Sequence, residues 1–167
     1  NRGVTHFRFE DDNFTLHPEY KSLCAELKKL NIRYKAHTRS DLMNPWRAEM
    51  MAESGCEECG LGVESADDKV LKLNNKRETA ADHIRAIRNL KSAGIRVKTY
   101  FMAGLPGETQ ETLNLNKQFV RDTKPEKWTL STFTPYPGSA VYKSPGLFGV
   151  QIINFDWSKW GNFVSSF

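Results

Sequence analysis

The chain reads VKTYFMA over Val97–Ala103 and continues directly as GLPGET over Gly104–Thr109. An apolar run that ends in a Gly/Pro-rich turn predicts a strand, a tight loop and a following helix. Gly104 and Gly107 carry no Cβ, so a ligand can approach the backbone there, and the next helix points its free N–H groups at the same place. In a parallel α/β protein this end of a strand is where ligands bind. Taken alone, the turn also fits an ordinary strand-to-helix connection.

The same strand–helix unit repeats along the chain. We predict strands over Thr5–Glu10, Arg33–Thr38, Glu58–Val63, Arg96–Ala103 and Trp128–Thr134. We predict helices from His17-Pro18 to about Leu30, from Asn44 to Ser54, from Asp67 to Leu73, from Thr79 to Gly94 and from Thr109 to about Thr123. Repeated units of this kind predict a parallel sheet, which right-handed crossovers curl toward a barrel. A full eight-fold barrel takes about 250 residues. The 167 residues therefore predict a partial (β/α) barrel of about five units, an α/β fold.

The repeat ends near Pro145, which sets the predicted domain boundary. We assign residues 1–145 to the partial barrel and residues 146–167 to a C-terminal extension. Trp157, Trp160 and Phe163 are expected to pack this extension against the barrel.

Polar side chains gather on one face of the predicted strands. They are His6, Arg8 and Glu10, then Lys35, His37 and Arg39, then Glu58 and Glu64, and finally Lys98 and Tyr100. Helices cover the outside of such a sheet, so this face is expected to line the lumen. Buried charges are costly unless they pair or meet water and ligand, which favours an open barrel with a wet channel. The alternative is that the polar face belongs to solvated edge strands. Gly60 and Gly62 favour the channel, because glycines weaken a strand unless something fits against it.

Several groups follow the strands at their carboxyl ends. They are Asp11 and Asp12, Arg39, Glu64 and Ser65, Gly104, and the segment Thr134–Gly138. Glu64 and Ser65 are suited to ribose hydroxyls or an α-amino group, and Arg39 is suited to a carboxylate. Each residue alone is also typical of a cap or a surface ion pair, and Asp11 is suited to capping a turn.

Composition and cysteines set broad limits. The net charge is +4, and the basic residues are scattered, so no nucleic-acid patch is predicted. No apolar run is long enough to span a bilayer and no signal-peptide pattern is present, so we expect a cytoplasmic location without a membrane partner. Three cysteines argue against a disulfide framework. Cys24 is expected in the core. Cys56 and Cys59 form a C-x-x-C that is redox-active, metal-binding or structural; we favour the structural interpretation, because no further ligands accompany the pair.

A set of motifs in fixed order resembles the radical S-adenosylmethionine (SAM) superfamily, in the branch shared by cobalamin-binding enzymes, methylthiotransferases and anaerobic ring cyclases. The matching segments are FEDDNF at 9–14, TRSDL at 38–42, GC at 55–56, GLGVES at 60–65, LKLNNK at 71–76, AGI at 93–95, GLPGET at 104–109 and FTPYPGS at 133–139. Together they cover about Thr5 to Tyr142.

The resemblance implies a six-stranded partial barrel in which a four-iron cluster binds SAM and cleaves it reductively to a 5′-deoxyadenosyl radical. It implies that Asp11 and Asp12 meet the methionine amino group, and that Glu64 and Ser65 contact ribose and methionine. It further implies that Gly104, Leu105 and Pro106 flank the adenine, together with Thr134 and Pro135. Arg39 holds either the methionine carboxylate or an acid on the substrate. The substrate is left open, and an upstream cobalamin domain is compatible with the resemblance.

One departure from the family pattern is decisive for activity. The family takes its cluster ligands from a C-x-x-x-C-x-x-C loop after the first barrel strand, and this sequence holds no such loop. The chain therefore resembles the barrel without its first strand and cluster loop, a fragment of the enzyme that is inactive alone and holds no metal. Its open strand edge is expected to allow self-association. Two other hypotheses stay open: a non-catalytic module that binds SAM, a nucleoside or a partner, and an iron-independent barrel enzyme with Glu64 as base near Lys98 or His37.

Overall fold

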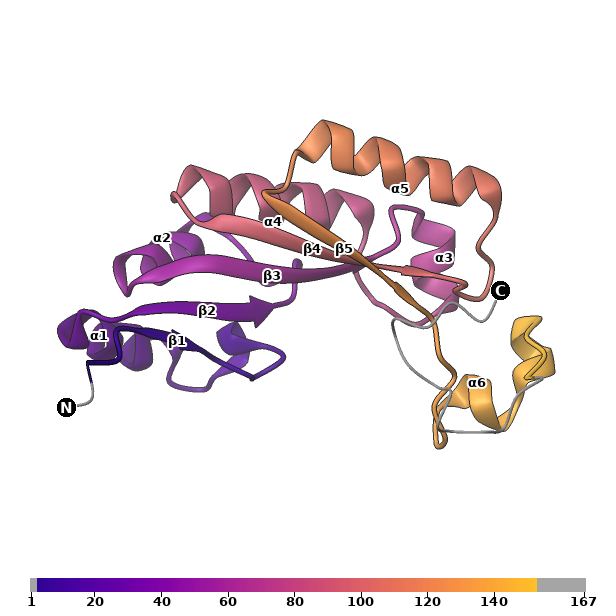
Figure 1. Ribbon diagram of the computed structural model, residues 1–167, viewed down its shortest axis with the longest axis horizontal. Helices are drawn as coiled ribbons and strands as arrows, with labels where there is room; N and C mark the ends of the chain where they lie inside the picture. The colour runs from indigo at the N-terminus through magenta and orange to yellow at the C-terminus, as the bar shows by residue number, and fades with distance from the viewer. Residues whose placement is uncertain (1–2, 153–167) are drawn as a thin grey trace.

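Five parallel strands form one curled sheet in the computed structural model, which describes residues 3–152 (Figure 1). The strands pair in chain order, and every connection is a crossover through the helical layer. They are β1 (His6–Arg8), β2 (Arg33–Thr38), β3 (Cys56–Glu64), β4 (Arg96–Ala103) and β5 (Lys127–Thr132). The result is a half-barrel, as the repeated strand–helix unit predicts.

Helices cover the convex side of this sheet (Figure 1). They are α1 (Tyr20–Leu30), α2 (Pro45–Glu53), α3 (Asp68–Leu73), α4 (Ala80–Ser92) and α5 (Gln110–Thr123). Short turns η1 (Phe14–Leu16) and η2 (Pro145–Phe148) and the one-turn helix α6 (Ala140–Lys143) complete the described elements.

Local sequence fixes most helix ends. Asn44 accepts a hydrogen bond from the Arg47 N–H at the start of α2, with Pro45 in the first turn. Thr79 and Thr109 each form a reciprocal capping box with the residue three positions later, at the starts of α4 and α5. The predicted start of α1 at His17-Pro18 is wrong: the chain first makes the turn η1, and α1 begins at Tyr20.

The apolar side chains of the strands lie under the helices. Tyr34, Ala36, Cys59, Leu61, Val63 and Val97 are each at most 1% exposed. They form one core with the inner faces of α1, α2 and α4. The polar residues of the same strands therefore lie on the opposite, concave face, which no described helix covers.

The C-terminal segment leaves the sheet after β5, and in Figure 1 α6 and η2 lie away from the strands. Leu147 in η2 is 84% exposed. Trp157, Trp160 and Phe163 lie outside the described residues, so the packing of this extension stays a prediction. No helix among residues 3–152 is long and apolar enough to span a membrane.

Candidate functional site

A cavity of about 450 Å³ opens on the concave face at the carboxyl ends of the strands. This volume lies within the range of small-molecule sites. Its charged lining consists of Arg8, Glu10, Asp12, Arg39, Glu64 and Lys76. The cavity brings together residues from β1, β2, β3, β4, β5 and the loop before α4, as convergence of parallel strands requires.

Glu64 reaches this cavity through an irregularity at the end of β3. The pairing register with β4 shifts between Gly62 and Glu64, and Glu64 takes a φ of 62°. A left-handed backbone at a residue other than glycine is costly and tends to occur at functional sites. The bend folds the carboxylate back over Gly62, where a Cβ would come within 2.7 Å of the Glu64 Oε1. Burial raises the pKa of Glu64, although the nearby Lys76 ammonium opposes the shift.

Lys76 supplies the positive charge opposite Glu64. Its Nζ lies 3.6 Å from Glu64 Oε1 and 3.3 Å from Glu78 Oε2. The flanking residues Asn75 and Arg77 both adopt left-handed backbone, with φ of 55° and 57°. This tight loop aims the lysine inward. The ammonium is therefore held between two carboxylates at the cavity wall.

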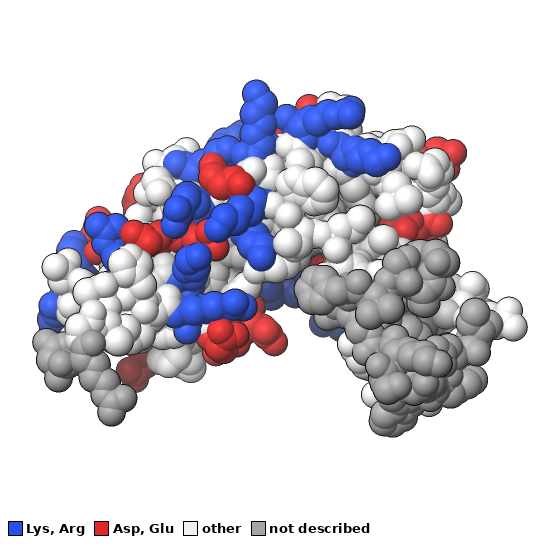
Figure 2. Space-filling model, viewed as in Figure 1, with Lys and Arg blue, Asp and Glu red and all other residues white. Residues whose placement is uncertain are grey.

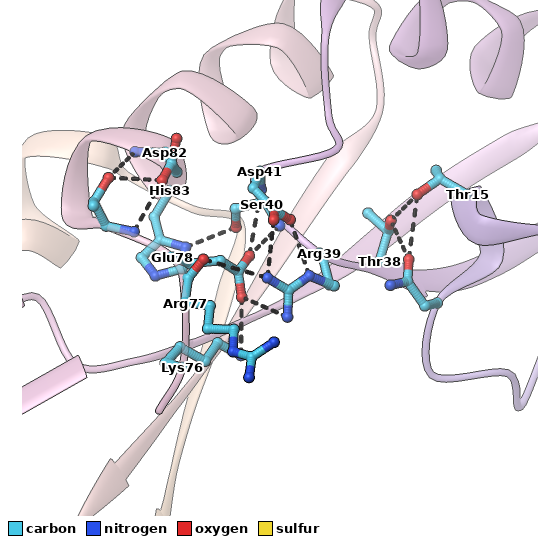
Figure 3. A network of polar contacts seen from close by, with 12 residues as sticks. Thr15, Thr38, Arg39, Ser40, Asp41, Lys76, Arg77, Glu78, Asp82 and His83 are labelled. Atoms are coloured by element: carbon cyan, nitrogen blue, oxygen red, sulfur yellow. Dashed lines mark hydrogen bonds and ion pairs between the residues drawn. The ribbon is translucent and has the colours of Figure 1, made fainter. Parts of the chain in front are cut away.

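Glu78 is the buried hub behind the cavity (Figure 3). Its side chain has no exposed surface, and Oε1 accepts a hydrogen bond of 2.6 Å from the Ser40 N–H. Oε2 lies between Lys76 and the guanidinium of Arg39, which is 3.7 Å away. Glu78 thus ties the loop after β2 to the loop before α4, which carries Lys76.

Arg39 lines the cavity but is already engaged. Its Nε and one terminal nitrogen donate to the two carboxylate oxygens of Asp41 at 3.0 and 2.9 Å. This two-pronged pair, together with Glu78, satisfies most of the guanidinium (Figure 3). Lys76, rather than Arg39, is the cation that faces Glu64.

The glycine-rich loop lies beside this wall. Gly104 has a φ of 81°, its N–H donates to Glu108 Oε1 at 2.6 Å, and a Cβ there would meet no atom within 4 Å. Asn74 donates to the Pro106 carbonyl at 2.9 Å, which joins this loop to the loop before α4. Leu105 is buried. The backbone at Gly104 is therefore bare, although residues 104–106 are not part of the cavity lining.

The remaining predicted residues take varied positions. Asp12 lines the cavity, whereas Asp11 accepts a hydrogen bond from the Asn13 N–H and closes a turn. Ser65 is buried, and its hydroxyl accepts from the Asp67 N–H at 3.1 Å. Thr134 and Pro135 follow β5 outside the lining, and the Thr134 carbonyl accepts from the Tyr136 N–H. Of the predicted site residues, the structure brings Asp12, Arg39 and Glu64 into one cavity.

The sequence suggests that Gly60 leaves room in the channel, but in the structure side chains of the chain itself fill this space. A Cβ there would lie 2.5 Å from His37 Nδ1 and 2.9 Å from the Tyr100 ring. The two rings, 5.5 Å apart at their centroids, therefore close over the strand. The glycine makes room for side chains of this chain.

The cysteines do not fit an iron–sulfur cluster. Cys24, Cys56 and Cys59 are free and buried in the core beneath the helices, as predicted. Burial raises the pKa of Cys59 to about 12, so the thiolate form that binds iron is disfavoured. No group of three or more metal-ligating side chains occurs within residues 3–152.

Comparison with known proteins identifies the family. Residues 1–119 match the Radical SAM superfamily. The chain belongs to this superfamily. It is 28% identical over 160 residues to a bacteriochlorophyllide d C-12(1)-methyltransferase of Chlorobaculum tepidum, covering 94% of this chain and 34% of that protein. It is 30% identical to an anaerobic magnesium-protoporphyrin IX monomethyl ester cyclase of Rubrivivax gelatinosus, covering 97% and 29%.

A solved structure shares the half-barrel. The radical SAM methyltransferase TsrM of Kitasatospora setae, with cobalamin and a [4Fe-4S] cluster bound, superimposes with a TM-score of 0.68 at 19% identity, over 77% of this chain and 26% of that one. This likeness shows the fold. The chain spans about a third of the length of the curated relatives named above. Radical SAM proteins use SAM and a four-iron cluster, as the motifs imply.

Lys76 and Glu78 are the site residues that the sequence did not single out. Lys76 lies at the end of the family motif at 71–76, which was the available signal. Glu78 gives no signal in the sequence, because its role depends on contacts with the loop after β2.

Proposed function

We propose that this chain forms the SAM-binding part of the catalytic domain in a full-length radical SAM enzyme. The observation that carries the proposal is the pairing of Glu64 and Lys76 across one cavity at the carboxyl ends of the strands. SAM presents both kinds of group that such a pair binds: hydroxyl and amino donors, and a carboxylate.

The two side chains suggest distinct roles. The Glu64 carboxylate is an acceptor for the ribose hydroxyls or the α-amino group, and the Lys76 ammonium is a partner for the methionine carboxylate. Asp12 adds a second acceptor on the wall formed by the segment after β1. Glu78, which also pairs with Arg39, positions Lys76 from behind, and Gly104 leaves backbone free of side chain in the neighbouring loop.

The cluster and the reaction subtype belong to the rest of the protein. No described residues fit the cluster, so its ligands lie elsewhere, and the cluster would supply the electron that cleaves SAM. Methyl transfer and ring cyclisation, the activities that the names of the relatives state, are the proposed reaction types. A cobalamin site in another domain is part of the same proposal, since TsrM binds cobalamin on a shared fold.

The test is SAM affinity in the full-length protein, measured by calorimetry under anaerobic conditions. Glu64→Gln removes the charge and keeps the shape. Loss of a charged hydrogen bond corresponds to about 1.5–3 kcal/mol, or roughly 10–100-fold in affinity. Glu49→Gln, at an exposed position of α2, is the matched control and should leave affinity unchanged. Equal SAM affinity in Glu64→Gln and the unsubstituted protein, with normal iron content, would remove Glu64 from the site.

Two further parts of the proposal concern the surroundings of the protein. We place it in the cytoplasm, where thiols stay reduced, and its three cysteines are free. We also propose that the isolated chain self-associates through β1, whose three residues are all exposed at the sheet edge. His6→Pro removes an N–H that points to the free edge, because Thr5 and Phe9 make the hydrogen bonds to β2, so this substitution should shift the isolated chain toward monomer in sedimentation velocity. If the unsubstituted isolated chain sediments as a monomer, the proposed self-association is contradicted.

A further inference from the structure

The amino-terminal half of the concave face carries a second, more basic surface. Arg8, Lys35, Lys98 and Lys127, from four different strands, line a cavity of about 220 Å³. We call these four residues the basic floor. Glu58 is the one carboxylate in the lining of this cavity. Figure 2 shows Lys and Arg side chains gathered over the middle of the sheet, with acidic side chains between them.

The strand register places like charges opposite one another in the basic floor. Arg8 pairs with Lys35 between β1 and β2, and Lys98 pairs with Lys127 between β4 and β5. Like charges directly opposite on neighbouring strands destabilise a sheet. Two such pairs on the same face require a compensating negative charge.

Within residues 3–152, acidic side chains supply only part of that charge. Glu58 lies 3.4 Å from Lys35 Nζ and accepts a hydrogen bond of 2.8 Å from Lys127. Arg8 pairs with Glu10 at 3.1 Å. Four cations thus share two carboxylates, which leaves an excess of two positive charges.

Lys98 is the cation of the basic floor that lacks a carboxylate partner among the described residues. Among residues 3–152 no carboxylate pairs with it, and its Nζ lies 4.7 Å from the centroid of the Tyr100 ring. The ring attracts the ammonium without neutralising it. Burial, together with the charges of Arg8 and Lys98, lowers the pKa of the neighbouring His37, so this ring is neutral at pH 7 and adds no charge.

The basic floor connects with the cavity of Glu64 and Lys76. The two cavities share Arg8, His37, Gly60 and Tyr100 in their linings. Lys98 and Met102 lie four residues apart on β4, which at the rise of a strand corresponds to about 13 Å. A molecule that reacts at the carboxyl ends of the strands can therefore extend an acidic group down to Lys98.

We propose that the basic floor binds the carboxylate or phosphate group of an acidic substrate. Lys98 and Lys127 donate to this group, and the reactive end of the substrate lies about 13 Å away toward the Glu64 cavity. The direction of the substrate rests on the proposed function, whereas the anion site itself does not.

The experiment measures anion binding to the full-length protein by calorimetry at low ionic strength. The probes are tricarballylate for carboxylates and inorganic pyrophosphate for phosphates. Lys98→Met keeps the length of the side chain and removes its charge, and Lys127→Met is the second variant. Lys117→Met is the matched control, because Lys117 lies exposed on α5 and has no ion pair among those found within residues 3–152. The affinity of SAM is measured on each sample.

We expect Lys98→Met and Lys127→Met each to lower the affinity for one of the probes about tenfold. The affinity of Lys117→Met should stay within about twofold of that of the unsubstituted protein. The tighter probe identifies the acid as carboxylate or phosphate. Equal weakening in all three variants, or no probe binding by the unsubstituted protein, overturns the proposal. The affinity for SAM separates this proposal from the proposed function. If the unsubstituted protein binds an anion probe but does not bind SAM, only the proposed function is contradicted. Unchanged SAM affinity in Lys98→Met shows that this variant is folded.

Discussion

The two faces of the sheet are built from alternate residues of the same strands, yet one is apolar and buried and the other is charged and partly exposed. The helix-covered face carries Leu61, Val63 and Val97, which have no exposed surface. The concave face carries charged residues, some of which form ion pairs with one another. Burial of apolar side chains stabilises the first face, whereas charged groups on the second face contribute little stability and, in our proposal, bind a ligand. Neighbouring positions on one strand should therefore answer differently to substitution.

The largest effect is expected on the covered face. Leu61→Ala should lower the free energy of unfolding by about 3 kcal/mol, because it removes packed atoms and leaves a cavity. Met102→Ala, on the concave face of β4, is only partly buried and should cost less than about 1 kcal/mol. Urea unfolding followed by circular dichroism measures both. Equal losses of unfolding free energy in the two variants would mean that the concave face is packed as tightly as the covered face.

A buried histidine makes the covered side sensitive to acid. His83 of α4 has no exposed surface, and its Nδ1 lies 2.7 Å from the Ser40 hydroxyl. Burial lowers its pKa to about 4, against the opposing charge of Glu78. The unfolded chain takes up this proton near pH 6.5, before the folded chain does, so stability is present above pH 6.5 and is lost as the pH falls toward 4.

The expected loss over that interval is about 3 kcal/mol. His83→Gln keeps a partner for Ser40 and does not titrate, so its stability should vary less between pH 6.5 and pH 4. Urea unfolding at half-unit pH steps measures the difference between the two proteins. Parallel pH profiles would show that His83 is not the group responsible.

An intermediate effect is expected at the hub between the faces. Glu78→Gln keeps the shape and an oxygen for the Ser40 N–H, but leaves Lys76 and Arg39 facing an uncharged group. We expect a loss of about 2 kcal/mol in stability. SAM affinity should fall too, because Lys76 loses its anchor. Glu49→Gln on the surface of α2 is the control for both readouts, and a Glu78 variant indistinguishable from it would show that the hub does not hold the site.

Sequence reasoning succeeds where one residue type decides the outcome. The strands Arg33–Thr38 and Arg96–Ala103 have the bounds that alternation predicts, and the caps at Asn44 and Thr79 start their helices. Asp12, Arg39 and Glu64 reach one cavity, because parallel strands end together. Lys76 was missed because its direction depends on two left-handed neighbours and on Glu78, which lies outside every motif in the sequence. The engagement of Arg39 by Asp41 likewise depends on side-chain geometry that no pattern of residue types encodes.

The smallest stability effect, and the sharpest contrast between the faces, is expected at Glu58. The charges of Lys127 and Lys35 lower its pKa in spite of burial, so this carboxylate contributes stability above its ordinary pKa near 4.3 and loses the contribution as the pH falls further. Its partners Lys35 and Lys127 are about half exposed, and pairs of this kind contribute little, so Glu58→Gln should change stability at pH 7 by less than about 1 kcal/mol. The same substitution removes the carboxylate that competes with an incoming anion, so binding of tricarballylate or pyrophosphate should become tighter by several-fold. Urea unfolding and calorimetry on the one variant test both statements. A variant that loses stability as Leu61→Ala does, with no gain in anion affinity, would mean that Glu58 is a structural ion pair and that the concave face is held together by its charges.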